Sequence, residues 1–103
     1  MIMLKLKPPK PPTEKDITTE IRKFLKFKGI FHYKAFQGLG SIRGISDIIG
    51  CYKGHFLAIE VKNQTNKLSE HQEAFLDNVR RSGGIAFVAR SVNDCIDNLK
   101  PYW

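Results

Sequence analysis

Two carboxylates and a lysine are spaced so that a β-hairpin would bring them together. Asp47 lies in one apolar, β-branched run, Glu60 and Lys62 lie in the next, and the pair Lys53-Gly54 separates the runs. This pattern predicts two strands joined by a two-residue turn. Asp47 then faces Glu60, with Cβ atoms ~4.5–5.5 Å apart, and Lys62 shares their face. Carboxylates this close repel unless a cation joins them or one is protonated. The pattern indicates a divalent-metal site; the alternative is a salt bridge between Lys62 and one acid.

The two strands of this hairpin, Ile45–Tyr52 and His55–Lys62, are apolar on both faces. The face of the carboxylates also carries Ile49, Cys51, Phe56 and Ala58, and the opposite face carries Ile48, Tyr52, Leu57, Ile59 and Val61. Two apolar faces are typical of a sheet that helices cover on both sides.

Capping residues and helical spacing predict three helices around this sheet. Helices are expected after the caps Thr13, Ser69 and Ser91, and further strands over Ile30–Phe36 and Ile85–Arg90. The last strand follows a helical crossover and should therefore run parallel to its neighbour. The order helix, three strands, helix, strand, helix predicts an α/β fold, a central mixed sheet flanked by helices.

The composition favours a polyanionic partner and a reducing compartment. Seventeen Lys and Arg against ten Asp and Glu give a formal net charge of +7. Cys51 and Cys95 lie on predicted core faces without the spacing of a zinc site, which favours reduced thiols in a cytoplasmic protein. The longest N-terminal apolar run, Met1–Leu4, is too short for a signal peptide or a membrane span.

The motif formed by Asp47 and Glu60-Val61-Lys62 resembles the D…ExK signature of the PD-(D/E)XK nuclease superfamily. The segments GISD, IEVK and LSEHQEAFLDNVRRSGGIAFVARSVND resemble the VRR-NUC branch, the virus-type replication and repair nucleases. That family usually has Pro before the aspartate, where this chain has Ser46. Because Pro fixes φ, Ser46 removes a backbone constraint next to Asp47 but no ligand.

The resemblance implies a restriction-endonuclease-like αβββαβα core and a divalent-metal-dependent DNA endonuclease. Mg²⁺, with Mn²⁺ able to substitute, would bind Asp47, Glu60, the Val61 carbonyl and Glu20 of the first helix. Mg²⁺ prefers such hard oxygen ligands. For Glu20 an alternative is a solvated ion pair with Lys23.

The resemblance also assigns roles to two residues beside the carboxylates. Lys62 would orient the attacking water or stabilise negative charge on the phosphate. Gln72 would lie at the edge of the active site, near the lysine. The alternative for Gln72 is a purely capping role, since it follows Ser69 at capping-box spacing.

Basic and glycine-rich segments outside the hairpin are candidates for DNA contact. The glycine-rich loop Gln37–Gly44 would let backbone N–H groups approach a phosphate, but it lacks the spacing of a nucleotide-binding loop, so no nucleotide cofactor is expected. The candidate DNA-binding residues are Arg22, Lys23, Lys26, Lys34, Ser41, Arg43 and Lys67.

The chain divides into an N-terminal arm with a proline-rich spacer, residues 1–12, and a single nuclease domain, residues 13–103. Coordinated cutting of two strands needs two active sites, which a two-fold homodimer supplies. Contact elements for such a dimer are the arm Met1–Leu6 and the end Tyr102-Trp103. Branched DNA of the Holliday type is the expected substrate. Alternatives are a monomeric nickase or exonuclease, a catalytically idle basic binding module, and a subunit that acts only within an assembly.

Overall fold

A computed structural model describes residues 10–103, so the predicted arm Met1–Leu6 lies outside the described part of the chain. One sheet has the strand order β1-β2-β3-β4. Its strands are β1 (Phe31–Lys34), β2 (Ile48–Tyr52), β3 (His55–Val61) and β4 (Ile85–Ala89). The first three strands are antiparallel, and β4 pairs with β3 in parallel. The predicted mixed sheet, including the parallel last strand, is confirmed.

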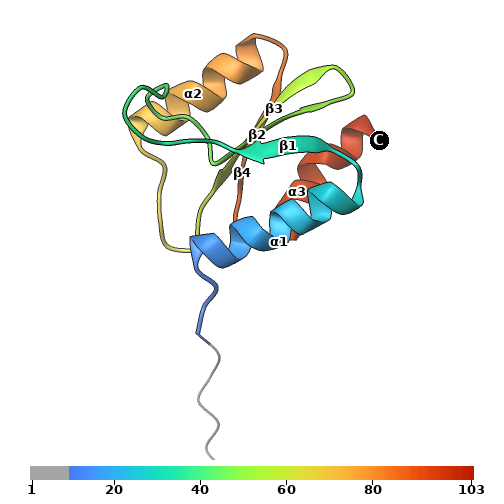
Figure 1. Ribbon diagram of the computed structural model, residues 1–103, viewed down its shortest axis with the longest axis horizontal. Coiled ribbons are helices and arrows are strands. Elements are labelled where there is room, and N and C mark those ends of the chain that lie inside the picture. Colours follow the sequence, from blue (N-terminus) through green and yellow to red (C-terminus); the bar gives the residue numbers. More distant parts are fainter. Residues whose placement is uncertain (1–9) are drawn as a thin grey trace, which may run out of the picture.

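Helices cover both faces of the sheet (Figure 1). They are α1 (Glu14–Phe27), α2 (Glu70–Arg81) and α3 (Val92–Leu99), and a short 3-10 helix, η1 (Lys100–Tyr102), follows. On one face, α1 and α3 pack their apolar stripes on Ile48, Leu57 and Ile59. On the other face, α2 packs on Ile49 and Ala58. The α/β prediction of a sheet between helical layers is confirmed.

Each helix begins where a polar side chain satisfies its free N–H groups. Thr13 and Asp16 form a reciprocal capping box on α1, and Ser69 and Gln72 form one on α2. On α3 the box is incomplete. The Ser91 hydroxyl accepts from the Asp94 N–H, but the Asp94 carboxylate accepts from the preceding Arg90 N–H at 2.7 Å. That bond ties the start of α3 to the end of β4.

The β2–β3 hairpin has the register that places the candidate acids opposite each other. Tyr52 pairs with His55 at the turn, and Ile48 pairs with Ile59 at the other end. Lys53 and Gly54 form the turn with φ of +49° and +82°, as two-residue hairpin turns of the I′ type require. The next facing pair along this register is Asp47 and Glu60.

One core prediction is wrong, because Cys51 is exposed. Its cross-strand neighbours Phe31 and Phe56 are exposed as well, at the hairpin end that lies beyond the cover of α2. Cys95 is fully buried as predicted, and burial raises the pKa of its thiol to about 12. A protonated thiol in an apolar core is a packing group.

The C-terminal end folds back on the domain. The Lys28 ammonium lies 4.0 Å from the centre of the Trp103 ring, and the rings of His55 and Tyr102 meet edge to face. Trp103 is still half exposed. In the described residues no helix combines the length and the apolar character needed to cross a membrane.

Candidate active site

Asp47 immediately precedes β2, and its side chain bonds to the neighbouring strand β3 at that end of the sheet. Its Oδ2 accepts the Val61 N–H at 2.7 Å, and its Oδ1 accepts from Gln37 Nε2 at 3.2 Å. The same Gln37 nitrogen donates to the Ile45 carbonyl at 3.0 Å. The carboxylate is therefore fixed from both sides. Gln37 was not a sequence candidate, and no spacing rule would have selected it from its loop.

Glu60, near the end of β3, is an acid almost removed from solvent, with 2% of its surface exposed. Its Oε1 accepts from Gln72 Nε2 at 3.1 Å, whereas Oε2 has no hydrogen-bond partner among residues 10–103. Burial, and then the negative charge of Asp47, raise the pKa of Glu60 to about 8. The nearby Lys62 ammonium opposes this shift without cancelling it. The site is thus built to receive a cation or to keep a proton.

Gln72 caps α2 and also contacts Glu60. Its Oε1 accepts the Ser69 N–H at 2.9 Å as part of the α2 capping box, and its Nε2 donates to Glu60. A single amide therefore joins the start of α2 to the buried acid. Because the cap fixes the rotamer of Gln72, it also fixes the orientation of the Glu60 carboxyl.

Lys62 is nearly buried, with 9% of its surface exposed. The backbone N–H of Lys62 donates to the Ala89 carbonyl at 3.1 Å, which extends the parallel pairing of β3 and β4. Within residues 10–103 the ion pairs closer than 4 Å are Lys23–Glu20 and Arg80–Asp77, so Lys62 does not form the simple salt bridge considered as an alternative. Its charge is close enough to Glu60 to oppose the rise in the pKa of that carboxyl.

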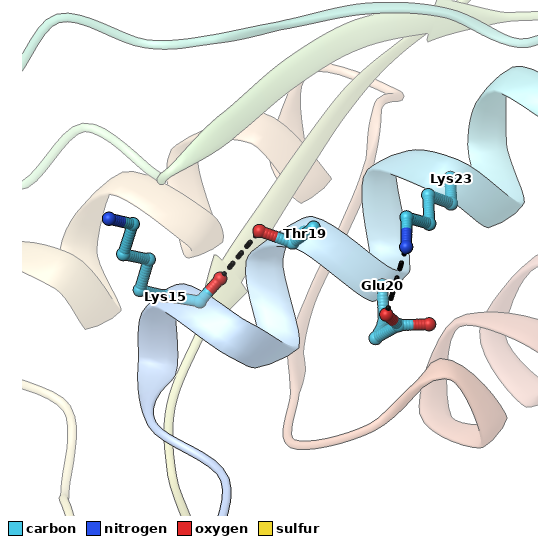
Figure 2. Close-up of polar contacts among 4 residues, drawn as sticks. All are labelled: Lys15, Thr19, Glu20 and Lys23. Carbon is cyan, nitrogen blue, oxygen red and sulfur yellow. Dashed lines mark hydrogen bonds and ion pairs between the residues drawn. The ribbon is translucent and has the colours of Figure 1, made fainter.

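Glu20 does not lie with Asp47 and Glu60. Its side chain is 63% exposed, and its Oε1 lies 3.4 Å from the Lys23 ammonium, one turn further along α1 (Figure 2). The placement corrects the expectation of a metal ligand and matches the alternative of a solvated pair. Glu20 is on the exposed side of the helix because the buried stripe runs through Ile17, Ile21 and Leu25.

The acid of α1 that approaches the site is Glu14, at the first position of the helix. Its carboxylate accepts from Asn66 Nδ2 at 2.6 Å and from the Asn63 N–H at 3.5 Å, and its charge contributes to the raised pKa of Glu60. Its contact across 52 positions of sequence could not be inferred from helical periodicity.

The loop after Lys62 is held by bonds within the loop, by Arg90 and by Glu14 of α1. Asn63 Oδ1 accepts from the N–H groups of Thr65 and Asn66, which shapes the turn. The Arg90 guanidinium donates to the carbonyls of Asn63 and Asn66. Together with the Glu14 contacts, these bonds fix the backbone directly after Lys62. They therefore restrain the position from which the Lys62 side chain extends.

Ser46, in the place of the family proline, is fully buried. Its hydroxyl has no hydrogen-bond partner among residues 10–103. The position is therefore restrained by packing, although the ring that usually restrains it is missing.

The predicted DNA-binding residues lie in three places. Ser41 and Arg43 line a pocket between the glycine-rich loop and the N-terminus of α2, next to Gln72. Gly44 allows this approach, because a Cβ there would lie 2.1 Å from the His71 carbonyl oxygen. Lys67 lines a separate pocket that also contains acids. Arg22, Lys23, Lys26 and Lys34 line a groove between α1 and β1.

The donor set fits a hard divalent cation with few protein ligands. The described residues contain no group of three His, Cys, Asp or Glu side chains close enough to hold a metal, so the carboxylates form a pair. One oxygen of that pair, Glu60 Oε2, is buried and has no partner. Mg²⁺ characteristically takes one or two carboxylates and keeps several waters.

The fold and this cluster define a class: a small α/β domain with the D…ExK residues of nucleases gathered at one end of a mixed sheet. The sequence model of the VRR-NUC domain matches residues 14–93, and the chain belongs to that family of nuclease domains. A solved structure named "VRR_NUC domain protein" is similar, with a TM-score of 0.71, 19% sequence identity, and coverage of 90% of this chain and 89% of that chain. At this identity the likeness shows the fold. Comparison with curated proteins finds no match.

Proposed function

We propose that the protein is a Mg²⁺-dependent endodeoxyribonuclease that hydrolyses DNA phosphodiesters, with Mn²⁺ able to substitute. Membership of a nuclease family supports the reaction class. The observation that carries the metal is the pair of the buried Glu60 and the half-buried Asp47: within residues 10–103 one oxygen of Glu60 has no hydrogen-bond partner, and the pKa of Glu60 is raised to about 8. Two adjacent acids under an apolar layer destabilise an empty site and favour a bound cation.

Asp47, Glu60 and the Val61 carbonyl would hold the metal, which supplies Lewis-acid polarisation of the phosphate and a lower pKa for water. Binding requires the ionised form of Glu60, so it releases the proton that burial retains. Gln72 orients the Glu60 carboxyl, and Gln37 and the Val61 N–H orient Asp47. Hydrogen-bonded ligands of this kind lose little freedom on binding.

Lys62 stabilises the negative charge that develops on the phosphoryl oxygens, or orients the attacking water. Its ammonium is nearly buried and forms no ion pair closer than 4 Å within the described residues, so the neighbouring acids leave its charge available. In a site shielded from water such a charge acts more strongly than at the surface.

The DNA approaches through the pocket that Ser41 and Arg43 line. This pocket reaches Gln72, the residue that contacts Glu60, and it includes the N-terminus of α2 at Ser69. Helix N-termini favour phosphate groups. Lys67 lies on the loop that follows Lys62 and adds a cation at the same end of the sheet.

The active unit is a homodimer that prefers branched DNA of the Holliday type. One domain of this size offers one site, and paired incisions need two. Three large aromatic side chains of β1 and β3 are about half exposed or more: Phe31, Tyr33 and Phe56. Contiguous exposed apolar groups of this kind suit contact with a second copy. Light scattering at micromolar protein tests the dimer. A monomer there would leave the nickase or exonuclease alternative.

The proposed location is the cytoplasm of a bacterium or of a phage-infected host cell. Neither Cys51 nor Cys95 is in a disulfide within the described residues, and both thiols suit a reducing compartment.

Cleavage of a four-way junction, a flap and a linear duplex, each with and without Mg²⁺, tests the proposal. We expect metal-dependent cleavage that is fastest on the junction. Equal rates on all three substrates would keep the nuclease and remove the branched-DNA preference. DNA binding without cleavage in either metal would favour the idle basic module instead.

A further inference from the structure

A groove of about 820 Å³ runs between α1 and β1. The basic side chains on its walls are Lys15, Arg22, Lys23, Lys26, His32 and Lys34. All but the last two come from α1. From Lys15 to Lys26 the helix extends about 16 Å at ~1.5 Å per residue. Phosphates on one DNA strand follow one another at ~3.4 Å along the axis, so this length matches about five phosphates.

Among residues 10–103, the groove is lined by five of the chain's seventeen Lys and Arg and by no Asp or Glu. The nearest acid contact is Glu20, which pairs with Lys23 at 3.4 Å and partly offsets that one charge. The other four Lys and Arg of the groove form no ion pair closer than 4 Å within residues 10–103. A row of cationic side chains that are mostly not paired with acids of the protein attracts a polyanion.

Hydroxyl groups in the groove do not compete for this role. The Thr18 hydroxyl donates to the Glu14 carbonyl at 2.8 Å. The Thr19 hydroxyl donates to the Lys15 carbonyl at 3.0 Å, as Figure 2 shows. His32 Nδ1 lies 2.9 Å from the Ile30 carbonyl oxygen, which can only accept, so this nitrogen is the donor. The long cationic side chains are therefore the groups that can reach a ligand.

One end of the groove adjoins the candidate active site. Lys34 pairs with Ile48, and the next residue, Ala35, donates its N–H to the Asp47 carbonyl at 2.8 Å. Lys15 follows Glu14, whose carboxylate holds the loop after Lys62. Because α1 and β1 run in opposite directions, Lys15 and Lys34 mark the end near the acids, and Lys26 marks the far end (Figure 1).

We propose that this groove binds the sugar–phosphate backbone of one DNA strand over about five nucleotides and leads it to or from the scissile phosphate. The inference rests on the proposed function for the identity of the polyanion. Phosphate contacts set register and affinity without reading sequence. The groove therefore adds binding strength to any DNA arm that enters it.

The test compares two double variants with the same loss of charge. Arg22→Ala with Lys26→Ala removes two groove cations, and Arg81→Ala with Lys100→Ala removes two exposed cations outside the groove. Binding of a fluorescent linear duplex is measured by anisotropy without divalent metal, over a range of salt. Each lost phosphate contact lowers the log–log salt slope by ~0.9. The groove variant should therefore lose about 1.8 of the slope, and the control variant none.

An equal loss of slope in both variants would mean that net charge alone determines the salt dependence, which would overturn the groove proposal. No loss in either would overturn it as well. If the wild type binds vesicles of anionic lipid, and the groove variant loses this binding but keeps DNA binding, the groove binds membranes and the proposal is overturned. Since no metal is present, these outcomes do not depend on cleavage. If the protein cleaves DNA but the groove variant keeps the wild-type salt slope, only the groove proposal is refuted. If binding depends on the groove but no cleavage occurs, only the nuclease proposal is refuted.

Discussion

The two charged regions of this molecule differ in their exposure to solvent. At the end of the sheet, Glu60 and Lys62 are buried beside the half-buried Asp47, and burial raises the pKa of Glu60 to about 8. Along the groove, residues such as Arg22 and Lys26 stay exposed to solvent. Buried charges interact strongly and individually, whereas exposed charges are screened and act as a sum. The first arrangement suits chemistry and the second suits affinity.

The largest expected effect comes from removing either carboxylate of the Asp47–Glu60 pair. Asp47→Ala and Glu60→Ala should abolish cleavage, because each removes half of the only carboxylate pair proposed to hold the metal. DNA binding without metal should stay within a few-fold of wild type, since neither residue lies in the basic groove. Cleavage assays beside anisotropy measure both. Wild-type turnover by either folded variant would refute the assignment of the site.

Lys62→Ala should lower single-turnover cleavage by ~10²–10³-fold, the usual cost of losing one electrostatic stabiliser of a transition state. Metal affinity should barely change, because an ammonium cannot be a ligand. Isothermal titration with Mg²⁺ beside single-turnover kinetics separates the two. Lost metal affinity with intact chemistry would mean that Lys62 acts on the acids and not on the phosphate.

The raised pKa of Glu60 makes the stability of the metal-free protein depend on pH. The unfolded chain releases this proton near the ordinary value of 4.5 and the folded chain near 8, so the folded state binds more protons in between. The stability that this proton contributes is present below about pH 4.5 and is lost as pH rises through about 8. The total is on the order of a few kcal/mol at ~1.4 kcal/mol per pKa unit.

Urea unfolding between pH 5 and 8 in EDTA measures this slope. Glu60→Gln should flatten it, because an amide keeps the shape and does not titrate. Glu20→Gln is the matched control and should keep the wild-type slope, since that side chain is 63% exposed. Saturating Mg²⁺ should also reduce the slope by favouring the ionised carboxyl. A wild-type slope in Glu60→Gln would place the titrating group elsewhere.

The sequence predicted the fold and the acid pair through local rules. Alternating apolar residues and a two-residue turn determine the hairpin register, and this register alone places Asp47 opposite Glu60. The N-cap at Thr13 and the capping box of Ser69 with Gln72 are equally local. Such rules depend on neighbours within a few positions, so a single sequence displays them.

What the sequence could not supply were contacts made between distant elements. Gln37 reaches Asp47 from a loop, and Glu14 reaches Asn66 from the start of a helix. Cys51 lies on an apolar strand face, yet it is exposed because α2 does not extend over that end of the hairpin. Helix length and docking decide these outcomes, and neither follows from strand alternation.

The smallest expected effect separates two acids on the same helix. Glu14 is half-buried and bonded to the loop after Lys62, whereas Glu20 is exposed and paired with Lys23. Glu14→Gln should lower cleavage by ~10-fold, the lower end of the range for residues that orient metal ligands. Glu20→Gln should leave it unchanged, because exposed i,i+3 pairs contribute only ~0.3–0.5 kcal/mol to stability.

Both substitutions remove one negative charge from α1, so each controls for the other. Titrating Mg²⁺ against the cleavage rate shows whether Glu14→Gln changes the metal requirement or only the maximal rate. A changed metal requirement would place Glu14 close enough to the cation to act on it directly. A change in the maximal rate alone would assign it to positioning Lys62 through Asn63 and Asn66. A loss in Glu20→Gln as large as in Glu14→Gln would break the comparison, because charge on α1 would then matter regardless of burial or contact.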